Sequence, residues 1–77
     1  LDLLLAKSLN SLASLHESKG EYDPALPLYE EALELRGRGL PPNHPAIAIS
    51  LNNLAHLLKR MGEYGRALAL QEAALLT

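Results

Sequence analysis

The sequence has no cysteine, no tryptophan and no phenylalanine among its 77 residues. Without cysteine, disulfide bonds and thiolate metal sites are excluded. Three tyrosines are its only large aromatic residues, while apolar residues make up 48% of the chain. A strand-rich core draws on valine, isoleucine and aromatic side chains, so this composition favours a helical core of leucine and alanine.

The charge is nearly balanced, with a formal net charge of −2 at pH 7. This balance does not draw the chain toward nucleic acid or an anionic membrane, and we expect neither as a partner. No apolar run approaches the roughly 18 residues of a membrane-spanning helix. The segment Leu1 to Ala6 lacks the basic start and the cleavage site of a signal peptide. The chain starts without methionine and stops at Thr77 within a helical pattern, so we expect it to belong to a longer polypeptide.

The sequence repeats itself after 42 residues. When residues 1–35 are placed over residues 43–77, nearly half of the aligned positions are identical. The identical segments include Ser8-Leu9-Asn10 with Ser50-Leu51-Asn52, and Gly20-Glu21-Tyr22 with Gly62-Glu63-Tyr64. Abundant leucine alone gives far fewer matches. We therefore divide this single domain, residues 1–77, into repeat one, residues 1–42, and repeat two, residues 43–77.

Each repeat has the pattern of two helices joined by a tight turn. In the first helix, Leu5, Leu9 and Leu12 recur on one helical face. Gly20 and Gly62 follow as the usual residues beyond a helix C-terminus. The sequence therefore predicts two antiparallel helix hairpins with no strand, and the four expected helices are Leu3–Lys19, Tyr22–Gly37, Pro45–Met61 and Tyr64–Leu76.

Proline marks the beginning of two of these helices. Asp23 is expected to cap the second helix, with Pro24 at its first helical position. Pro27 is expected to bend this helix mildly without breaking it. Two glycines and three prolines between Arg36 and Pro45 predict a linker between the hairpins.

The third helix is expected to start at Pro45, with Asn43 or His44 near its cap. Small alanine side chains at the helix crossings allow the helices to approach closely. The residues that we predict to be largely buried are Leu12, Ala13, Ala25, Tyr29, Ala32, Leu54, Ala55 and Ala67.

The pattern of small residues and the repeated Gly-Glu-Tyr turn resemble the tetratricopeptide repeat over nearly the whole chain. The common form has 34 residues per repeat. The longer spacing here, with Asn-His-Pro at 43–45 and Leu-Asn-Asn-Leu-Ala at 51–55, is similar to the repeats of kinesin light chains and many bacterial sensor and scaffold proteins. Two positions depart from that pattern. The first repeat has Ser11 where the second has Asn53, and the second repeat has Gln71 where the first has Tyr29. The resemblance implies an all-α solenoid that serves as a protein–protein interaction scaffold without a cofactor.

In solenoids of this class, the first helix of each hairpin lines the concave side. The resemblance implies that exposed positions on these helices hold a protein or an extended or helical peptide. Asn10 and Asn52 have equal phase, and a carboxamide both donates to and accepts from a peptide backbone; the alternatives are plain exposure or bracing of adjacent helices. Lys59 and Arg60 favour an acidic partner, although two basic residues on an exposed helix are common. The predicted partner-binding residues are Lys7, Asn10, Ser14, Glu17, Asn52, His56, Lys59 and Arg60.

The sequence contains no catalytic constellation. His16 and Glu17 form half of a zinc-protease helix motif, but Gly20 stands where the second histidine belongs. The run of carboxylates from Glu30 to Glu34 has no neighbouring base or nucleophile and is typical of a solvated helix face. We therefore expect no enzymatic activity and no bound metal.

Self-assembly is a second class of function that the sequence leaves open. Repeat solenoids bury a continuous core by stacking, and their terminal repeats usually carry a polar outer face. Both ends of this sequence are instead rich in leucine, which would allow copies to stack end to end into a filament. The alternative is that further repeats cover the ends. The predicted end-stacking residues are Leu1, Leu4, Leu5, Leu75 and Leu76.

Overall fold

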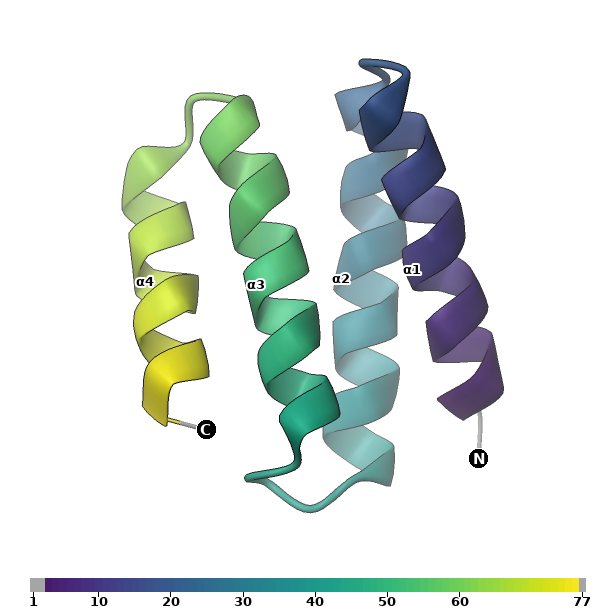
Figure 1. The fold of residues 1–77 in the computed structure, drawn as a ribbon, viewed down its shortest axis with the longest axis vertical. Coiled ribbons are helices and arrows are strands. Elements are labelled where there is room, and N and C mark those ends of the chain that lie inside the picture. The colour runs from purple at the N-terminus through teal and green to yellow at the C-terminus, as the bar shows by residue number, and fades with distance from the viewer. Residues whose placement is uncertain (1–2, 77) are drawn as a thin grey trace.

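The computed structural model describes residues 3–76 and contains four α-helices in that range (Figure 1). In chain order they are α1 (Leu3–Ser18), α2 (Tyr22–Gly39), α3 (Pro45–Arg60) and α4 (Tyr64–Leu76). Residues 3–76 contain no strand, so the predicted all-α fold is confirmed. The pairs α1–α2 and α3–α4 are antiparallel hairpins, and α2 packs against α3 to join them.

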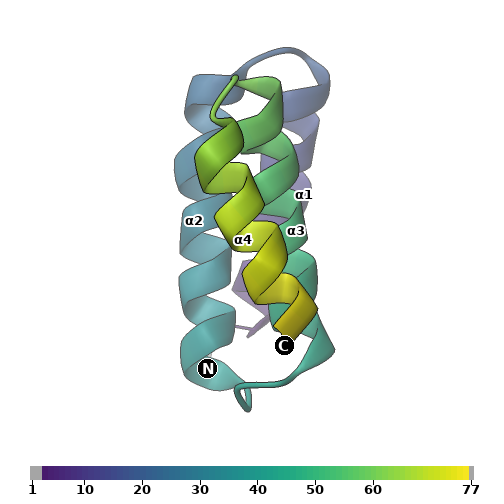
Figure 2. The ribbon, with the colours of Figure 1, turned by 90° about the vertical axis from the view of Figure 1, so that its left-hand side faces the viewer.

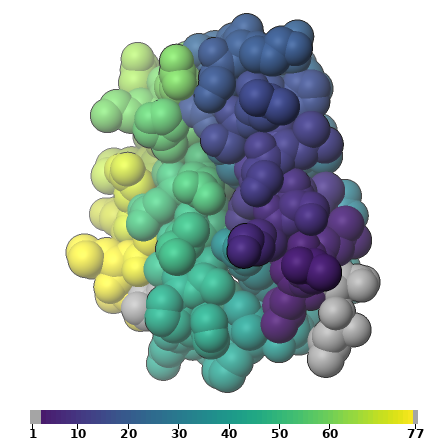
Figure 3. Space-filling model, turned by 45° about the vertical axis from the view of Figure 1, so that its right-hand side comes forward, coloured from purple at the N-terminus to yellow at the C-terminus, as the bar shows by residue number. Residues whose placement is uncertain are grey.

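The four helices stand side by side, with α1 at one edge and α4 at the other (Figure 1). Seen from the edge of α4, helices α1 and α3 lie toward one side and α2 toward the other, while α4 slants across in front (Figure 2). Side chains of α1 and α3 therefore share one face of the molecule, which Figure 3 shows.

The same turn closes both hairpins. Gly20 has a φ of +78° and Gly62 a φ of +84°, in the left-handed region that favours glycine. In each turn the residue after the glycine donates its N–H to the carbonyl five residues earlier, at 2.8 Å. This is the Schellman arrangement, which satisfies carbonyl groups at a helix end. The predicted glycine stops are confirmed, although α1 and α3 each end one residue earlier than expected.

The prediction that Asp23 caps α2 is wrong. The cap residue is Glu21, and its side chain makes no capping hydrogen bond. Because α2 begins directly after the glycine turn, Asp23 is already its second residue, where a negative charge is favourable at the positive end of the helix dipole. The prediction that Pro24 is the first helical residue is also wrong, because it is the third, where its missing N–H still has no partner to lose. The helix continues through Pro27, as predicted.

The C-terminal end of α2 extends two residues beyond the predicted one, to Gly39. Leu40 completes the helix by donating its N–H to the carbonyl of Arg36 at 3.0 Å. Within the last turns, Arg38 pairs with Glu34, four residues earlier. These contacts stabilise the helical conformation despite two glycines. The linker between the hairpins is therefore shorter than predicted.

Helix α3 begins at Pro45, as predicted, and His44 is its cap. The Nδ1 atom of His44 accepts the N–H of Ala46 at 3.0 Å. Arg36 reaches across from α2 and donates to the carbonyl of Ala46 at 3.2 Å and to the Ser50 hydroxyl at 2.9 Å. The start of α3 is therefore fixed both locally and by the end of α2.

The core lies along the junction between the two hairpins. Of the residues predicted to be buried, only Leu12 is wrong, with 45% of its surface exposed. Its counterpart in the second repeat, Leu54, is 4% exposed because α3 packs against α2. Within the described residues, no helix lies against the corresponding side of α1. The buried residues that form the core cluster are Ala13, Ala25, Tyr29, Leu54, Ala55, Leu57, Leu58 and Ala67.

Candidate functional site

Glu17 is the one buried charged residue in the described part of the chain, with 5% of its surface exposed. Its Oε1 atom accepts a hydrogen bond from the Tyr29 hydroxyl at 2.9 Å. Its Oε2 atom lies 2.7 Å from Nδ1 of His56 and 3.5 Å from Nη1 of Arg60. The carboxylate of α1 is thereby joined to side chains of α2 and α3, and it links the two hairpins.

Arg60 is held from a second direction by an aromatic ring. Its guanidinium carbon lies 5.5 Å from the centre of the Tyr22 ring, in the range of a cation–π contact. The arginine therefore has both a carboxylate and a ring to fix its position, while its side chain stays partly exposed. His56 is likewise anchored by Glu17 and largely exposed. The buried carboxylate thus positions two basic groups at the surface.

The phenol of Tyr29 is a firm donor in this cluster. Burial raises the pKa of Tyr29 to about 12, and its hydrogen bond to the Glu17 carboxylate adds to the rise. A pKa raised on folding contributes stability that is fully present below the unfolded value of about 10. That stability is lost as the pH rises through the folded value, so the window of loss lies between about pH 10 and 12.

The substitution Tyr29→Phe should lower the free energy of unfolding at neutral pH by about 2 kcal/mol, because the buried carboxylate loses a hydrogen-bond donor. It should also remove the alkaline loss of stability that Tyr29 causes. Urea denaturation at pH 8 and at pH 11 measures both effects. Tyr64→Phe, at an exposed tyrosine, is the control and should behave like the parent. An alkaline loss of equal size in the Tyr29→Phe variant and the parent would contradict this assignment.

The structure brings three of the predicted partner-binding residues together, namely Glu17, His56 and Arg60. The expected exposure of Glu17 is wrong, because its carboxylate is enclosed by partners from α2 and α3. The periodicity of α1 alone gives no sign of those partners. The other predicted residues lie on α1 and α3, and the exposed ones among them are Lys7, Ser14, Asn52 and Lys59. Their role in binding stays a prediction.

The two asparagines occupy equal positions in the repeats but differ in their surroundings. Asn52 is exposed, whereas Asn10 is partly buried. The carboxamide oxygen of Asn10 is enclosed, and it accepts no hydrogen bond from the described residues. An enclosed acceptor without a partner is unfavourable, so a donor that reached Asn10 would be stabilised by it.

Exposed carboxylates are absent from α1 and α3, whereas α2 and α4 carry both acidic and basic groups, the basic ones including Arg38 and Arg66. Helices α1 and α3 together contain a single carboxylate, that of Glu17, and it is buried. Their exposed charged groups are basic, whereas the exposed glutamates of the helices, Glu30, Glu31, Glu34 and Glu72, lie on α2 and α4. We call the surface of α1 and α3 that carries Lys7, Asn10, Ser14, Asn52, His56, Lys59 and Arg60 the α1/α3 face. The absence of acidic residues from these two helices, apart from Glu17, is visible in the sequence and is a signal for this face.

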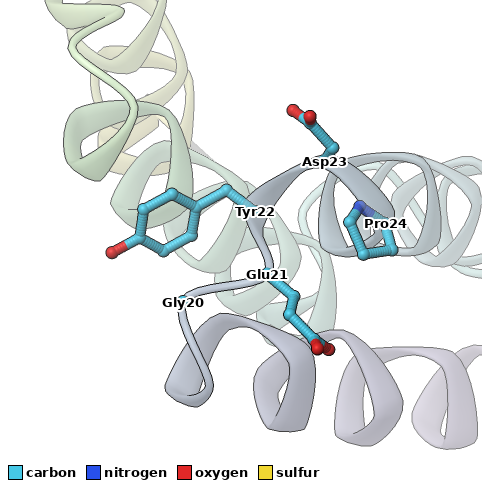
Figure 4. Close-up of a pocket in the computed structure, with 5 residues that line it drawn as sticks. All are labelled: Gly20, Glu21, Tyr22, Asp23 and Pro24. Atoms are coloured by element: carbon cyan, nitrogen blue, oxygen red, sulfur yellow. The ribbon is translucent and has the colours of Figure 1, made fainter.

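A small open hollow lies at the first glycine turn, lined by residues 20–24 (Figure 4). The side chains of Glu21, Tyr22 and Asp23 leave the turn in different directions. Glu21 is engaged locally, because His16 lies 2.8 Å away and its hydrogen bond lowers the pKa of Glu21, with a further contribution from the charge of Lys19. A binding pocket needs polar groups that converge on a ligand, and this hollow lacks them.

The predicted end-stacking residues Leu4, Leu5, Leu75 and Leu76 are all exposed. Leu1 lies outside the described residues. Within residues 3–76, no group of three or more histidine, aspartate or glutamate residues is placed to hold a metal ion. In the same range, no helix has the length and apolar character needed to cross a membrane.

Comparison with known families finds that the model of the tetratricopeptide repeat matches residues 4–75. The match includes both hairpins and nearly all of the chain. The family is a non-catalytic one whose members are scaffolds for protein–protein interaction. The likeness to kinesin light chains in particular stays a prediction. Comparison with curated proteins finds no match to this chain.

Proposed function

This chain belongs to the tetratricopeptide repeat family, and we propose that it holds an acidic peptide segment of a partner protein on its α1/α3 face. The family supports a role as a protein-binding scaffold in general, and the face and the chemistry of the partner are our proposal. The observation that carries it is the lack of any exposed carboxylate on α1 and α3. The α1/α3 face presents basic groups, and its one carboxylate is buried and already engaged.

The contacts of Glu17 leave the basic groups of this face available to a partner. A guanidinium has five N–H donors, and the single contact of Arg60 with Glu17 at 3.5 Å leaves most of them free to meet a carboxylate. Lys7 and Lys59 are exposed on the same two helices. An acidic segment lying across α1 and α3 would therefore meet positive charge along its length, which favours binding and speeds association.

The asparagines supply the contacts that a peptide backbone needs. Asn52 is exposed and offers both donors and an acceptor. The unpaired oxygen of Asn10 gains a hydrogen bond if the side chain turns toward a peptide N–H. Backbone contacts of this kind hold a segment irrespective of its side chains, and the basic groups then select acidic ones.

Replacing Asn10 and Asn52 together with alanine should weaken binding by about 0.5–1.5 kcal/mol for each lost hydrogen bond. The free energy of unfolding should not fall, because the enclosed oxygen of Asn10 makes no hydrogen bond within the described residues. The measurement is titration calorimetry with a panel of acidic peptides. Each peptide is paired with one that carries glutamine and asparagine in place of its glutamates and aspartates.

The matched control is Glu31→Gln on α2, an exposed residue on the other side of the molecule, which should leave the affinity unchanged. Binding of the acidic peptides should weaken as salt is added, because exposed charges are screened. Unchanged affinity in the double alanine variant would remove the asparagines from the site. Equal affinity for the acidic and the neutral peptides would overturn the proposed partner chemistry.

A further inference from the structure

The outer side of α1 is an uncovered copy of the surface that α3 uses to pack on α2. Leu12 and Leu15 are 45% and 60% exposed. Their counterparts 42 residues further on, Leu54 and Leu57, are 4% and 0% exposed at the α2–α3 junction. Ser8 is exposed in the same way, while Ser50 is buried. The sequence of this surface is shared by the two repeats, and within residues 3–76 only the second copy of it has a helix against it.

The outer side of α4 is an uncovered copy of the surface that α2 presents to α3. Its exposed apolar side chains are Tyr64, Leu68 and Leu75. Their counterparts in α2 are Tyr22, Leu26 and Leu33, which pack against the core cluster. The chain therefore carries both halves of its internal junction a second time. One half lies on α1 and the other on α4, at opposite edges of the row of helices (Figure 1).

The polar centre of the internal junction is repeated with its donors and acceptors exchanged. Inside the chain, the acceptor Glu17 is surrounded by a tyrosine, a histidine and an arginine. In the second hairpin, Lys59 takes the position of Glu17, and Gln71 that of the tyrosine. On α1, Ser14 and Ser18 take the positions of the histidine and the arginine. The side chain of Lys59 only donates hydrogen bonds, whereas those of Gln71, Ser14 and Ser18 can accept them. The two edges can therefore meet without placing two like charges opposite each other.

From these two correspondences we propose that copies of this chain associate head to tail, with α4 of one copy packed on α1 of the next. The new junction would reproduce the α2–α3 junction, with the lysine at its polar centre in place of the glutamate. Because the contact joins two different surfaces, it does not close on itself and extends the row of helices from copy to copy. The apolar part of the contact uses the two edges of the molecule, while its polar centre includes Ser14 and Lys59 of the α1/α3 face.

The test is a mixing experiment with two variants, Leu12→Glu on α1 and Leu68→Glu on α4. Both residues are exposed, so each variant should fold, as circular dichroism melts can verify. In sedimentation at high micromolar concentration, the parent should form a concentration-dependent series of oligomers. Each variant alone keeps only one working edge and should be a monomer. The two mixed together should form a species of twice the 8.4 kDa chain mass and nothing larger.

A parent chain that stays monomeric under these conditions would overturn the proposal. So would a single variant that still dimerises, because that result indicates a symmetric contact between like edges. Leu15→Glu and Leu75→Glu form a second, independent pair at exposed positions and should give the same pattern.

The polar centre of the proposed contact can be tested by substituting a charged residue for Ser18, which is exposed at the end of α1. Ser18→Glu should tighten association roughly two- to fivefold by pairing with Lys59 of the neighbouring copy, and Ser18→Lys should weaken it by a similar factor. In a Lys59→Glu background the order of the two variants should reverse. An unchanged order would show that these positions do not meet.

Discussion

Leu57→Ala should lower the free energy of unfolding by about 3 kcal/mol. Leu57 is fully buried in the core cluster at the junction of the two hairpins. Truncating a buried leucine removes its transfer free energy and leaves a cavity, which together destabilise a protein by about 2–5 kcal/mol. In a domain of this size, where total stability is small, a loss of this extent should lower the midpoint of a thermal or urea melt substantially.

The repeat provides a matched control, because Leu15 is the same residue at the same position of the first hairpin. Leu15 is 60% exposed, so Leu15→Ala should cost less than about 1 kcal/mol in the monomer. Both variants are compared by urea denaturation at low protein concentration, where association is negligible. Similar losses in the two variants would contradict the assignment of the core to the junction between the hairpins.

Glu17→Ala should lower the free energy of unfolding by a similar amount, about 3 kcal/mol. The substitution leaves the buried Tyr29 hydroxyl without its acceptor, and an unsatisfied buried polar group costs about 1–3 kcal/mol. It also removes the contacts with His56 and Arg60, which join α1 to α3. Urea denaturation at pH 7 measures the loss.

The control again comes from the second repeat, where Lys59 stands at the position of Glu17. Lys59 is exposed, so Lys59→Ala should change the free energy of unfolding by less than about 0.5 kcal/mol. A loss in Glu17→Ala no larger than in Lys59→Ala would show that the carboxylate does not link the hairpins. Glu17→Gln should fall between the two, since the amide oxygen still accepts from Tyr29 but carries no charge.

The parts of the fold that were predicted correctly depend on local chemistry. Gly20 and Gly62 stop their helices because the left-handed conformation there suits glycine. The predicted end of α2 is two residues too early, because the glycines there indicate a linker. The sequence does not reveal that Arg38 pairs with Glu34 within the last turns of the helix. The exposure of Leu12 could not be predicted from periodicity. Leu12 and Leu54 are identical in the repeat, and only the neighbouring helix makes them differ.

The candidate site was harder to predict than the fold, because its central contacts join distant parts of the sequence. Glu17 meets Tyr29 12 residues away and His56 39 residues away. The periodicity of a single helix placed Glu17 on the exposed side, since it contains no information about the helices that flank it. The basic character of α1 and α3 depends on composition alone and was accessible from the sequence.

The order of helix contacts along the chain bears on how the molecule folds. Each helix packs chiefly on the helix before it and the helix after it. Contacts between near neighbours in sequence form at low entropic cost and early in folding. During folding, α1 and α2 can therefore pair around the turn at Gly20 before α3 packs against α2. The carboxylate of Glu17 then gains two of its three partners, His56 and Arg60, only when α3 joins the first hairpin.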